Sequence, residues 1–262
     1  MIFALSRLAA VLMVAPVAIW AAAKPAPAQE AAPNPASTQQ RPITAIIELF
    51  TSQGCSSCPP ADAILKTYAQ TEGVLALSLP VDYWDYIGWK DTLASPENTL
   101  RQRAYVKSIG RSSVYTPQAV INGVTDAVGS DQTAIDRAIS KSSKLLEDRR
   151  VPIVFRRQSS SLMVETGARP AGSDLQEATI WLIVMKKSAE VAIKRGENRG
   201  KTISYTNVVR EMTPIGVWNG KPSSLQLTLA AVMDPDTEDS VVLLQEGASG
   251  NGAIVGAAWL NR

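Results

Sequence analysis

The chain has 262 residues, of which 45% are hydrophobic and 19% are charged, and these proportions are typical of a folded globular protein. Its formal net charge of +2 is nearly balanced, which argues against the basic surface that nucleic-acid binding requires. Histidine is absent, which excludes Ser-His-Asp hydrolysis and any tetrahedral zinc site that needs more than two Cys or His ligands.

The amino-terminal segment, residues 1–28, is predicted to be a Sec-type signal peptide. A short, positively charged start is followed by an apolar run over residues 8–23, and small residues offer cleavage sites after Ala23 or Ala28. The apolar run is shorter than the ~20 residues of a membrane-crossing helix, so we expect cleavage and no stable membrane span afterwards. The alternative is an uncleaved anchor, and in either case the rest of the chain would be periplasmic or secreted.

Residues 29–42 are rich in Ala, Pro and Gln and are predicted to form an extended tether. The first folded domain, residues 43–149, is predicted to be α/β. Its expected elements, in chain order, are a strand over 43–50, a helix over 59–72, a strand over 74–81, a helix from Pro96 to Gly110, a hairpin over 118–128 that turns at Asn122-Gly123, and an amphipathic helix that Ser130 caps.

The second half, residues 150–262, changes in character and is predicted to be an all-β, sandwich-like domain. Short alternating runs are separated by turns that contain Gly, Ser and Pro. We find no catalytic pattern there. The charged segment 194–201 is expected to be a solvated hairpin tip, and the alternative is an anion site.

Cys55 and Cys58 form a Cys-x-x-Cys pair between a predicted strand and a predicted helix. The first sulfur of such a pair lies near the positive end of the helix, which stabilises a thiolate, and the second is close enough to resolve a mixed disulfide. We therefore predict a redox-active disulfide. The alternatives are a purely structural disulfide and a two-thiolate Cu(I) site.

Two prolines, Pro59 and Pro60, follow the motif directly. They fit within the first helical turn after a cap at Ser57, but they remove two N–H donors that would otherwise stabilise a Cys55 thiolate. Asp62 adds a nearby negative charge. We therefore expect Cys55 to be a less acidic thiol than the strongest oxidases of this type possess.

Several segments resemble a widespread thioredoxin-like secreted family catalogued as domain of unknown function 1223, within the thioredoxin superfamily. The resemblance lies in residues 47–62 around Cys55-Ser56-Ser57-Cys58, in Val81-Asp82-Tyr83-Trp84-Asp85, in residues 114–123, and in 195–198 and 205–209 of the second half. It implies a thioredoxin-like fold for the first domain.

The resemblance also implies roles for residues outside the cysteine pair. Pro117 matches the cis-proline that faces the motif, and Thr116 before it would contact an extended peptide; an ordinary trans proline is the alternative. Glu48 matches a buried acid that moves the proton of the second cysteine, unless it is a strand-end glutamate that faces solvent.

An aromatic run that includes Trp84 follows the second predicted strand, whose carboxyl end should open near the cysteines. Large aromatic side chains more often fill the core, so we expect packing there. The alternative is that Trp84 and Asp82 form the rim of a peptide groove.

Together these observations predict an exported thiol-disulfide oxidoreductase that acts on protein thiols or disulfides of the cell envelope. Cys55 would exchange with the partner, Cys58 would resolve, and no organic cofactor or metal would be needed. The alternatives are a non-enzymatic binding module with a structural disulfide, and a Cu(I)-handling protein.

Overall fold

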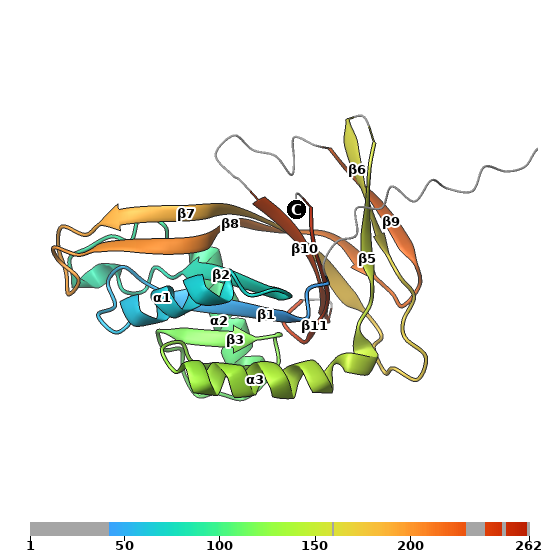
Figure 1. The fold of residues 1–262 in the computed structure, drawn as a ribbon, viewed down its shortest axis with the longest axis horizontal. Helices are drawn as coiled ribbons and strands as arrows, with labels where there is room; N and C mark the ends of the chain where they lie inside the picture. Colours follow the sequence, from blue (N-terminus) through green and yellow to red (C-terminus); the bar gives the residue numbers. More distant parts are fainter. Residues whose placement is uncertain (1–41, 159, 229–238, 248–249, 261–262) are drawn as a thin grey trace, which may run out of the picture. The chain divides into compact units, whose positions relative to one another are not determined.

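A mixed sheet of eight strands forms the centre of the structure (Figure 1). The computed structural model describes residues 42–158, 160–228, 239–247 and 250–260. The predicted signal peptide, and the predicted tether up to residue 41, lie outside the described residues. In the part of the chain that is described, no helix is long and apolar enough to cross a membrane. The fold is mixed α/β with one large sheet and few helices.

The described residues form two sheets and three helices. Across the large sheet the strands follow the order β11 (Ile254–Trp259), β10 (Asp239–Glu246), β7 (Ala178–Ala192), β8 (Thr202–Trp218), β2 (Val74–Pro80), β1 (Ala45–Thr51), β3 (Gln118–Ile121) and β4 (Thr125–Val128). The small sheet has the order β5 (Ile153–Arg157), β6 (Ser161–Thr166) and β9 (Ser223–Thr228). The helices are α1 (Pro59–Tyr68), α2 (Pro96–Ile109) and α3 (Gln132–Leu145), with short 3-10 turns η1 (Asp85–Ile87) and η2 (Glu147–Arg149).

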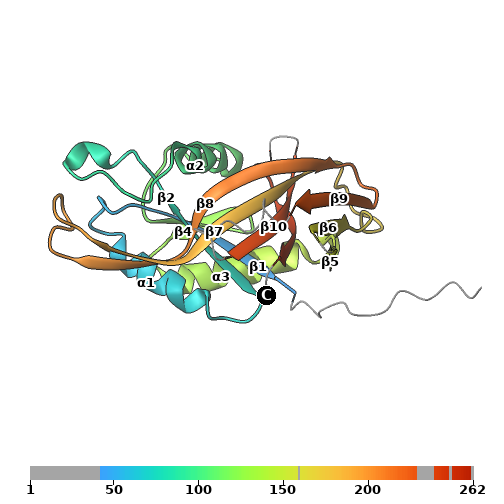
Figure 2. The same ribbon diagram turned by 90° about the horizontal axis from the view of Figure 1, so that it is seen from above.

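Helices cover both faces of the first-half strands (Figure 2). β1 is buried on both faces, and alternate side chains along it point to opposite sides. Ile47 and Leu49 belong to the apolar cluster that includes α1 and α3. Ile46 and Phe50 belong to the cluster that includes Tyr105 of α2. The near-continuous apolar sequence of β1 is explained by this double burial.

Local signals fix the ends of several elements. The Ser95 hydroxyl caps α2 by accepting two backbone N–H groups of its first turn, and Gly110 ends that helix in the left-handed region at φ 76°. The Asn122-Gly123 turn joins β3 to β4 as predicted. α3 is capped by Asp131 rather than by Ser130, because the Asp131 carboxylate accepts the N–H of Ala134.

The second half does not form the separate sandwich that we expected. Four of its strands continue the first-half sheet, where β8 joins β2 in parallel at Ser78 and Val208. The small sheet packs on this extension through an apolar cluster that includes Val164, Leu182 and Leu244. One layer of the sandwich-like packing is thus the shared sheet. Pairing with β8 also covers the edge of β2, which would otherwise be unpaired. Strands replace alternating strands and helices after about residue 150, as predicted, but the large sheet contains strands from both sides of this point.

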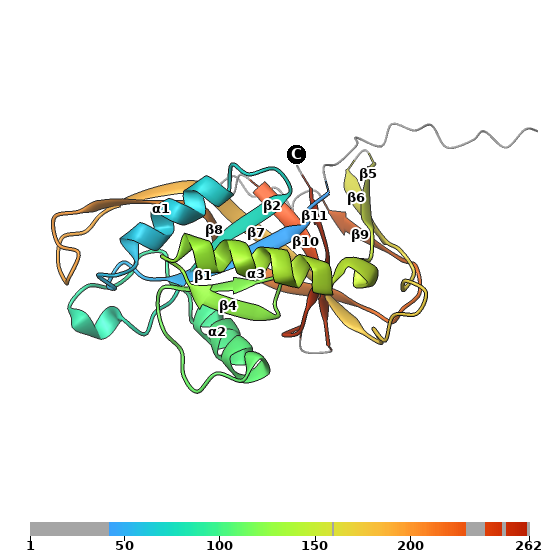
Figure 3. The same ribbon diagram turned by 60° about the horizontal axis from the view of Figure 1, so that its bottom comes forward.

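β7 and β8 form a long antiparallel hairpin whose register runs from Ala178 opposite Trp218 to Ala192 opposite Thr202. Its far half contacts α1, and Figures 1 and 3 both show it beside that helix. Ile193, Ile203 and Tyr205 are buried in this half. The tip, residues 193–201, is thereby brought to the start of α1.

Candidate redox site at the Cys55–Cys58 disulfide

Cys55 and Cys58 are joined by a disulfide at the junction between β1 and α1, with their Cα atoms 5.4 Å apart. The Cys55 N–H donates to the Ser52 carbonyl, and the Cys58 N–H donates to the Cys55 carbonyl, each at 3.2 Å. Cys58 itself occupies the cap position before Pro59, one residue later than the cap we expected at Ser57. The motif is therefore a tight turn that leads directly into the first helical turn.

Both sulfur-bearing side chains are buried in this structure. Cys55 is 1% exposed and Cys58 is 0% exposed, whereas Ser56 and Ser57 between them face solvent. The Ser57 hydroxyl lies 3.3 Å from the Cys55 sulfur. The exposed surface of the motif is therefore formed by its two serines.

The tip of the β7–β8 hairpin covers the motif. The Asn198 side-chain amide donates to the carbonyl oxygens of Gln53 at 2.9 Å and Cys55 at 2.8 Å. The Ser56 N–H donates to the Glu197 carboxylate at 3.2 Å. Because Asn198 is fully buried, our expectation of a solvated hairpin tip is wrong at this residue. The expectation failed because the carbonyl groups that accept from Asn198 belong to the motif, which is distant in the sequence.

Thr116 and Trp84 are brought together beside the motif. The Trp84 indole N–H donates to the Thr116 hydroxyl at 2.8 Å. A Cβ placed on Gly54 would lie 3.0 Å from the Trp84 Cβ, so the indole residue packs against the residue before Cys55. Trp84 is partly buried and stacks on exposed Tyr86, with ring centroids 6.4 Å apart.

Pro117 lies near α1, whereas Asp82 is bound to α2. The Thr116–Pro117 peptide bond is cis. A Cβ placed on Gly129 would lie 3.1 Å from the Cβ atoms of both Ala61 and Pro117, which sets Pro117 beside the first turns of α1. Asp82 instead accepts the Thr99 hydroxyl at 2.6 Å, so its carboxylate is tied to the start of α2.

Glu48 lies on the α2 face of the sheet, and its carboxylate is held there by other groups. Arg101 donates to it at 2.6 Å through Nε, and the Tyr105 hydroxyl also donates to it. Ile47 and Leu49, its neighbours in the strand, are the residues that face α1. The structure does not bring Glu48 to the cysteines, because strand alternation points it to the other side.

The buried acid on the α1 side is Asp62, which we had considered only as a nearby charge. It is 3% exposed, and neither carboxyl oxygen has a hydrogen-bond partner of standard geometry among the described residues. Burial raises the pKa of Asp62 well above its usual range, the Thr51 hydroxyl lowers it, and the charge of Asp91 raises it. Asp62 lies three residues before Leu65 and therefore on the buried face of the predicted helix. This spacing was the feature of the sequence from which its burial could have been predicted.

Asp91 organises the loop beside the motif. One of its carboxylate oxygens accepts the Gln53 N–H, and the other accepts the N–H groups of Leu93 and Ala94. Burial raises the pKa of Asp91, while those three N–H donors lower it. This loop and the hairpin tip hold the backbone before Cys55 from both sides.

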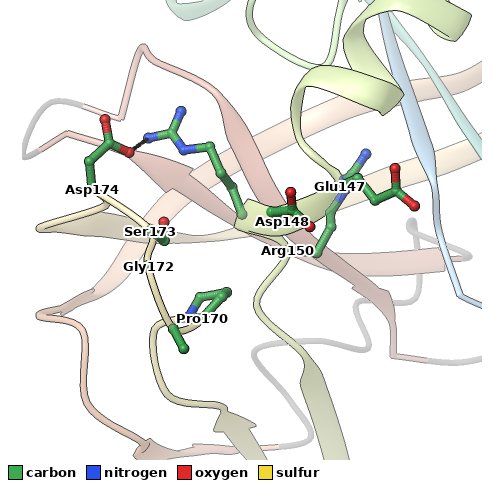
Figure 4. Close-up of a pocket in the computed structure, with 9 residues that line it drawn as sticks. Glu147, Asp148, Arg150, Pro170, Gly172, Ser173 and Asp174 are labelled. Atoms are coloured by element: carbon green, nitrogen blue, oxygen red, sulfur yellow. Dashed lines mark ion pairs between the residues drawn. The ribbon is translucent and has the colours of Figure 1, made fainter.

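Two cavities lie elsewhere. One of about 510 Å³ lies between α2 and the β7–β8 hairpin, lined by Arg101, Trp181 and Met212 among others. One of about 440 Å³ lies between η2 and residues 170–174, where the ion pair of Arg149 with Asp174 crosses it (Figure 4). Neither is lined by the cysteines. Among the described residues, no three Cys, Asp or Glu side chains gather in a way that would hold a metal ion.

Comparison with known proteins gives a family and a set of structural neighbours. Residues 46–245 match the family described as "Protein of unknown function (DUF1223)". The crystal structure of protein AGR_C_4864 from Agrobacterium tumefaciens is similar, with a TM-score of 0.73 and 35% identity over 84% of this chain and 95% of that chain.

Two more distant proteins are also similar. HBP35 of Porphyromonas gingivalis has a TM-score of 0.54 with 11% identity, over 83% of this chain and 74% of that chain, which indicates a shared fold alone. A probable thioredoxin of Archaeoglobus fulgidus is 46% identical over 37 residues, which are 14% of this chain and 41% of that protein.

Proposed function

The chain belongs to the family described as "Protein of unknown function (DUF1223)", and from this membership and the site we propose that it exchanges disulfides with protein thiols through Cys55 and Cys58. The observation that carries the proposal is the Cys55–Cys58 disulfide at the junction of β1 and α1. A helix start stabilises a nearby thiolate through its dipole, and this supports thiol exchange here even though Pro59 and Pro60 lack two of the N–H donors.

We further propose that the first half is a thioredoxin-like unit. Its support is the parallel pairing of β1 with β2, the antiparallel pairing of β1 with β3, and helices on both faces. The short match to a probable thioredoxin points the same way. The small-residue cleavage sites in the sequence support export to the cell envelope as part of the same proposal.

The exchange proceeds in two balanced steps. A partner thiolate attacks the Cys55 sulfur, a mixed disulfide forms, the Cys55–Cys58 bond breaks, and Cys58 leaves with the electron pair. A second partner thiolate then attacks the partner's sulfur in that mixed disulfide, which releases Cys55 as a thiolate and leaves the partner oxidised. The reverse sequence reduces a partner disulfide. Because both sulfurs are buried, either direction requires a local opening that exposes Cys55, and we propose that the hairpin tip, whose Asn198 binds the Cys55 carbonyl, is the part that moves.

The burial of both sulfurs favours a second candidate, a binding module in which the disulfide is a permanent staple. Equilibration of the folded protein in glutathione redox buffers separates the two. A working pair is expected to have a reduction potential above about −300 mV, whereas a structural disulfide lies below that value.

Trapping with the Cys58→Ala variant tests the exchange directly. With Cys55 free and no resolving thiol, the variant is expected to form a stable mixed disulfide with a disulfide-bonded peptide. The matched control is Cys55→Ala, which keeps only the more buried thiol and should trap far less. Equal trapping by both variants, or none by either, would contradict the assignment of Cys55 as the exchanging residue.

A further inference from the structure

Three buried polar side chains meet beneath the β7–β8 hairpin, and in the part of the chain that the structure describes none of them has a hydrogen-bond partner of standard geometry. They are Asp62 of α1, Thr51 of β1 and Tyr205 of β8. All three are at most 3% exposed. Buried polar groups without partners cost free energy of folding, so a cluster of them indicates a role other than stability.

The surroundings of Asp62 favour its protonated form. Thr51 faces it from β1 and Tyr205 from β8, and both are uncharged. Asp91, the charged group that acts on it from the neighbouring loop, is itself negative. Burial raises the pKa of Asp62 most, the Thr51 hydroxyl lowers it, and the charge of Asp91 raises it, so that the pKa lies well above its usual range. A carboxyl group in such a place exchanges a proton closer to neutral pH than an ordinary aspartate does.

Asp62 also lies next to the second cysteine along the helix. Its backbone N–H donates to the Cys58 carbonyl at 3.1 Å. Residues four apart in a helix lie on the same face, with Cβ atoms roughly 5–6 Å apart. Because Cys58 is fully buried, bulk water does not reach its sulfur in this structure.

We propose that Asp62 is the group that gives a proton to the Cys58 sulfur when the disulfide opens and takes it back when the disulfide closes. The proposal rests on the thiol exchange proposed above. The proposal gives Asp62 of α1 the proton-transfer role that the sequence resemblance had suggested for Glu48. Tyr205 makes the second half of the chain part of the same site, since it helps to enclose the carboxyl group.

The proton and electron balance is simple. On opening, a partner thiolate forms a bond to the Cys55 sulfur, the Cys55–Cys58 bond breaks, and Cys58 leaves with the bonding electrons. The Asp62 carboxylic acid gives its proton to Cys58, which leaves a Cys58 thiol and an Asp62 carboxylate. On closing, the Asp62 carboxylate takes the thiol proton while the Cys58 sulfur attacks Cys55 of the mixed disulfide. The partner thiolate then leaves.

The closing step can be measured with 5,5′-dithiobis(2-nitrobenzoic acid) as the disulfide probe. In the reduced full chain, attack by Cys55 releases one coloured thiolate, and resolution by Cys58 releases a second. At pH 7 the second phase is expected to be at least about tenfold slower in Asp62→Asn than in the unchanged protein, in the range of general-base effects. At pH 9.5 the two rates should converge, because hydroxide is then abundant enough to act as the base in place of Asp62.

Asp131→Asn is the matched control, because it neutralises an exposed helix-cap carboxylate with a residue that also caps well. It should leave both phases unchanged. A second phase in Asp62→Asn that is equal to that of the unchanged protein, or faster, at pH 7 would overturn the proposal. A general loss of fold would instead expose both buried sulfurs, so it would be recognised by a faster first phase and not by a selectively slower second phase.

Infrared difference spectra between the disulfide and dithiol forms give a readout that needs no exchange partner. Chemical reduction of the unchanged protein should alter a carboxylic-acid C=O band that is missing in Asp62→Asn. If that band does not respond to the redox state, the role of Asp62 is wrong even where Cys55 exchanges normally. If the band responds but no peptide is trapped by Cys58→Ala, the proposed function fails and the proton coupling stands.

Discussion

Two buried acids, Glu48 and Asp62, lie on opposite faces of the sheet and differ in what surrounds them. Glu48 is paired with Arg101, whose guanidinium also donates to Tyr105 and Gln245. Asp62 has no ion-pair or hydrogen-bond partner of standard geometry among the described residues. The charge of Glu48 is therefore satisfied and structural, whereas Asp62 is held in a place where its charge is unfavourable.

The pH dependence of stability should reveal Asp62. Because its pKa is raised in the folded state, its protonated form favours folding at low pH, and this contribution is lost as the pH rises through the folded pKa. Asp62→Asn should therefore gain stability relative to the unchanged protein as the pH increases above about 4, by at most about 1.4 kcal/mol per pH unit. Urea unfolding of both proteins at pH 4 and pH 8 measures the difference. A constant difference across that range would contradict the raised pKa.

Removal of one partner of the Glu48–Arg101 pair should be costly. Arg101→Leu leaves the fully buried Glu48 carboxylate without its cation, and such changes cost about 3–5 kcal/mol. Chemical denaturation measures the loss.

The milder Glu48→Gln change should lower stability without slowing thiol exchange per folded molecule. A selective loss of Cys58 reactivity in Glu48→Gln would restore Glu48 as the proton-exchanging residue and remove Asp62 from that role.

At the scale of elements, the hairpin tip is bonded to the backbone around Cys55, and we expect it to limit access to the Cys55 sulfur. Asn198→Ala removes two hydrogen bonds to the backbone of the motif, each worth about 1 kcal/mol. We expect the Cys55–Cys58 disulfide to be reduced by glutathione at least about tenfold faster in this variant. The rate is followed by alkylation of the released thiols.

Arg199→Ala is the control for that experiment, because its side chain is exposed at the same tip. The Cys55–Cys58 disulfide of this variant should be reduced by glutathione at the same rate as that of the unchanged protein. If Asn198→Ala is no faster than this control, the tip does not limit access, and the cover over the sulfurs must come from Trp84 and its neighbours.

Local signals explain which elements could be predicted from the sequence. Ser95, Gly110 and Asn122-Gly123 specify caps and a turn through their own side chains or backbone freedom, so the helix and hairpin they bound were predictable. The disulfide at Cys55 and Cys58 followed from spacing.

The remaining features depend on pairing between distant segments. The contact of Asn198 with the motif spans 143 residues from Cys55, and the single pairing of Ser78 with Val208 decides that the two halves share a sheet. Neither is encoded by a local pattern. Strand alternation predicts that Glu48 points to the opposite side of the sheet from Ile47 and Leu49. The sequence did not show which of these two sides α1 covers.

At the scale of the whole molecule, the two halves depend on each other through the shared sheet. Ile183, Met185 and Val209 of the second half are buried in the same apolar cluster as β2 and α2. A fragment of residues 43–149 would expose that surface and the outer edge of β2. We expect it to unfold without a cooperative urea transition, or to associate as its concentration rises. A monomeric fragment with the midpoint of the full chain would show that the halves are independent.

The shared sheet also sets an order for folding during synthesis. β1 to β4 are complete once residue 128 has been made, yet the strand that covers β2 begins at Thr202. For some seventy residues of growth the nascent chain presents an open strand edge, and its closing contacts are distant in sequence, which slows folding. A chaperone that holds the growing chain should therefore raise the yield of native protein more than one added after release.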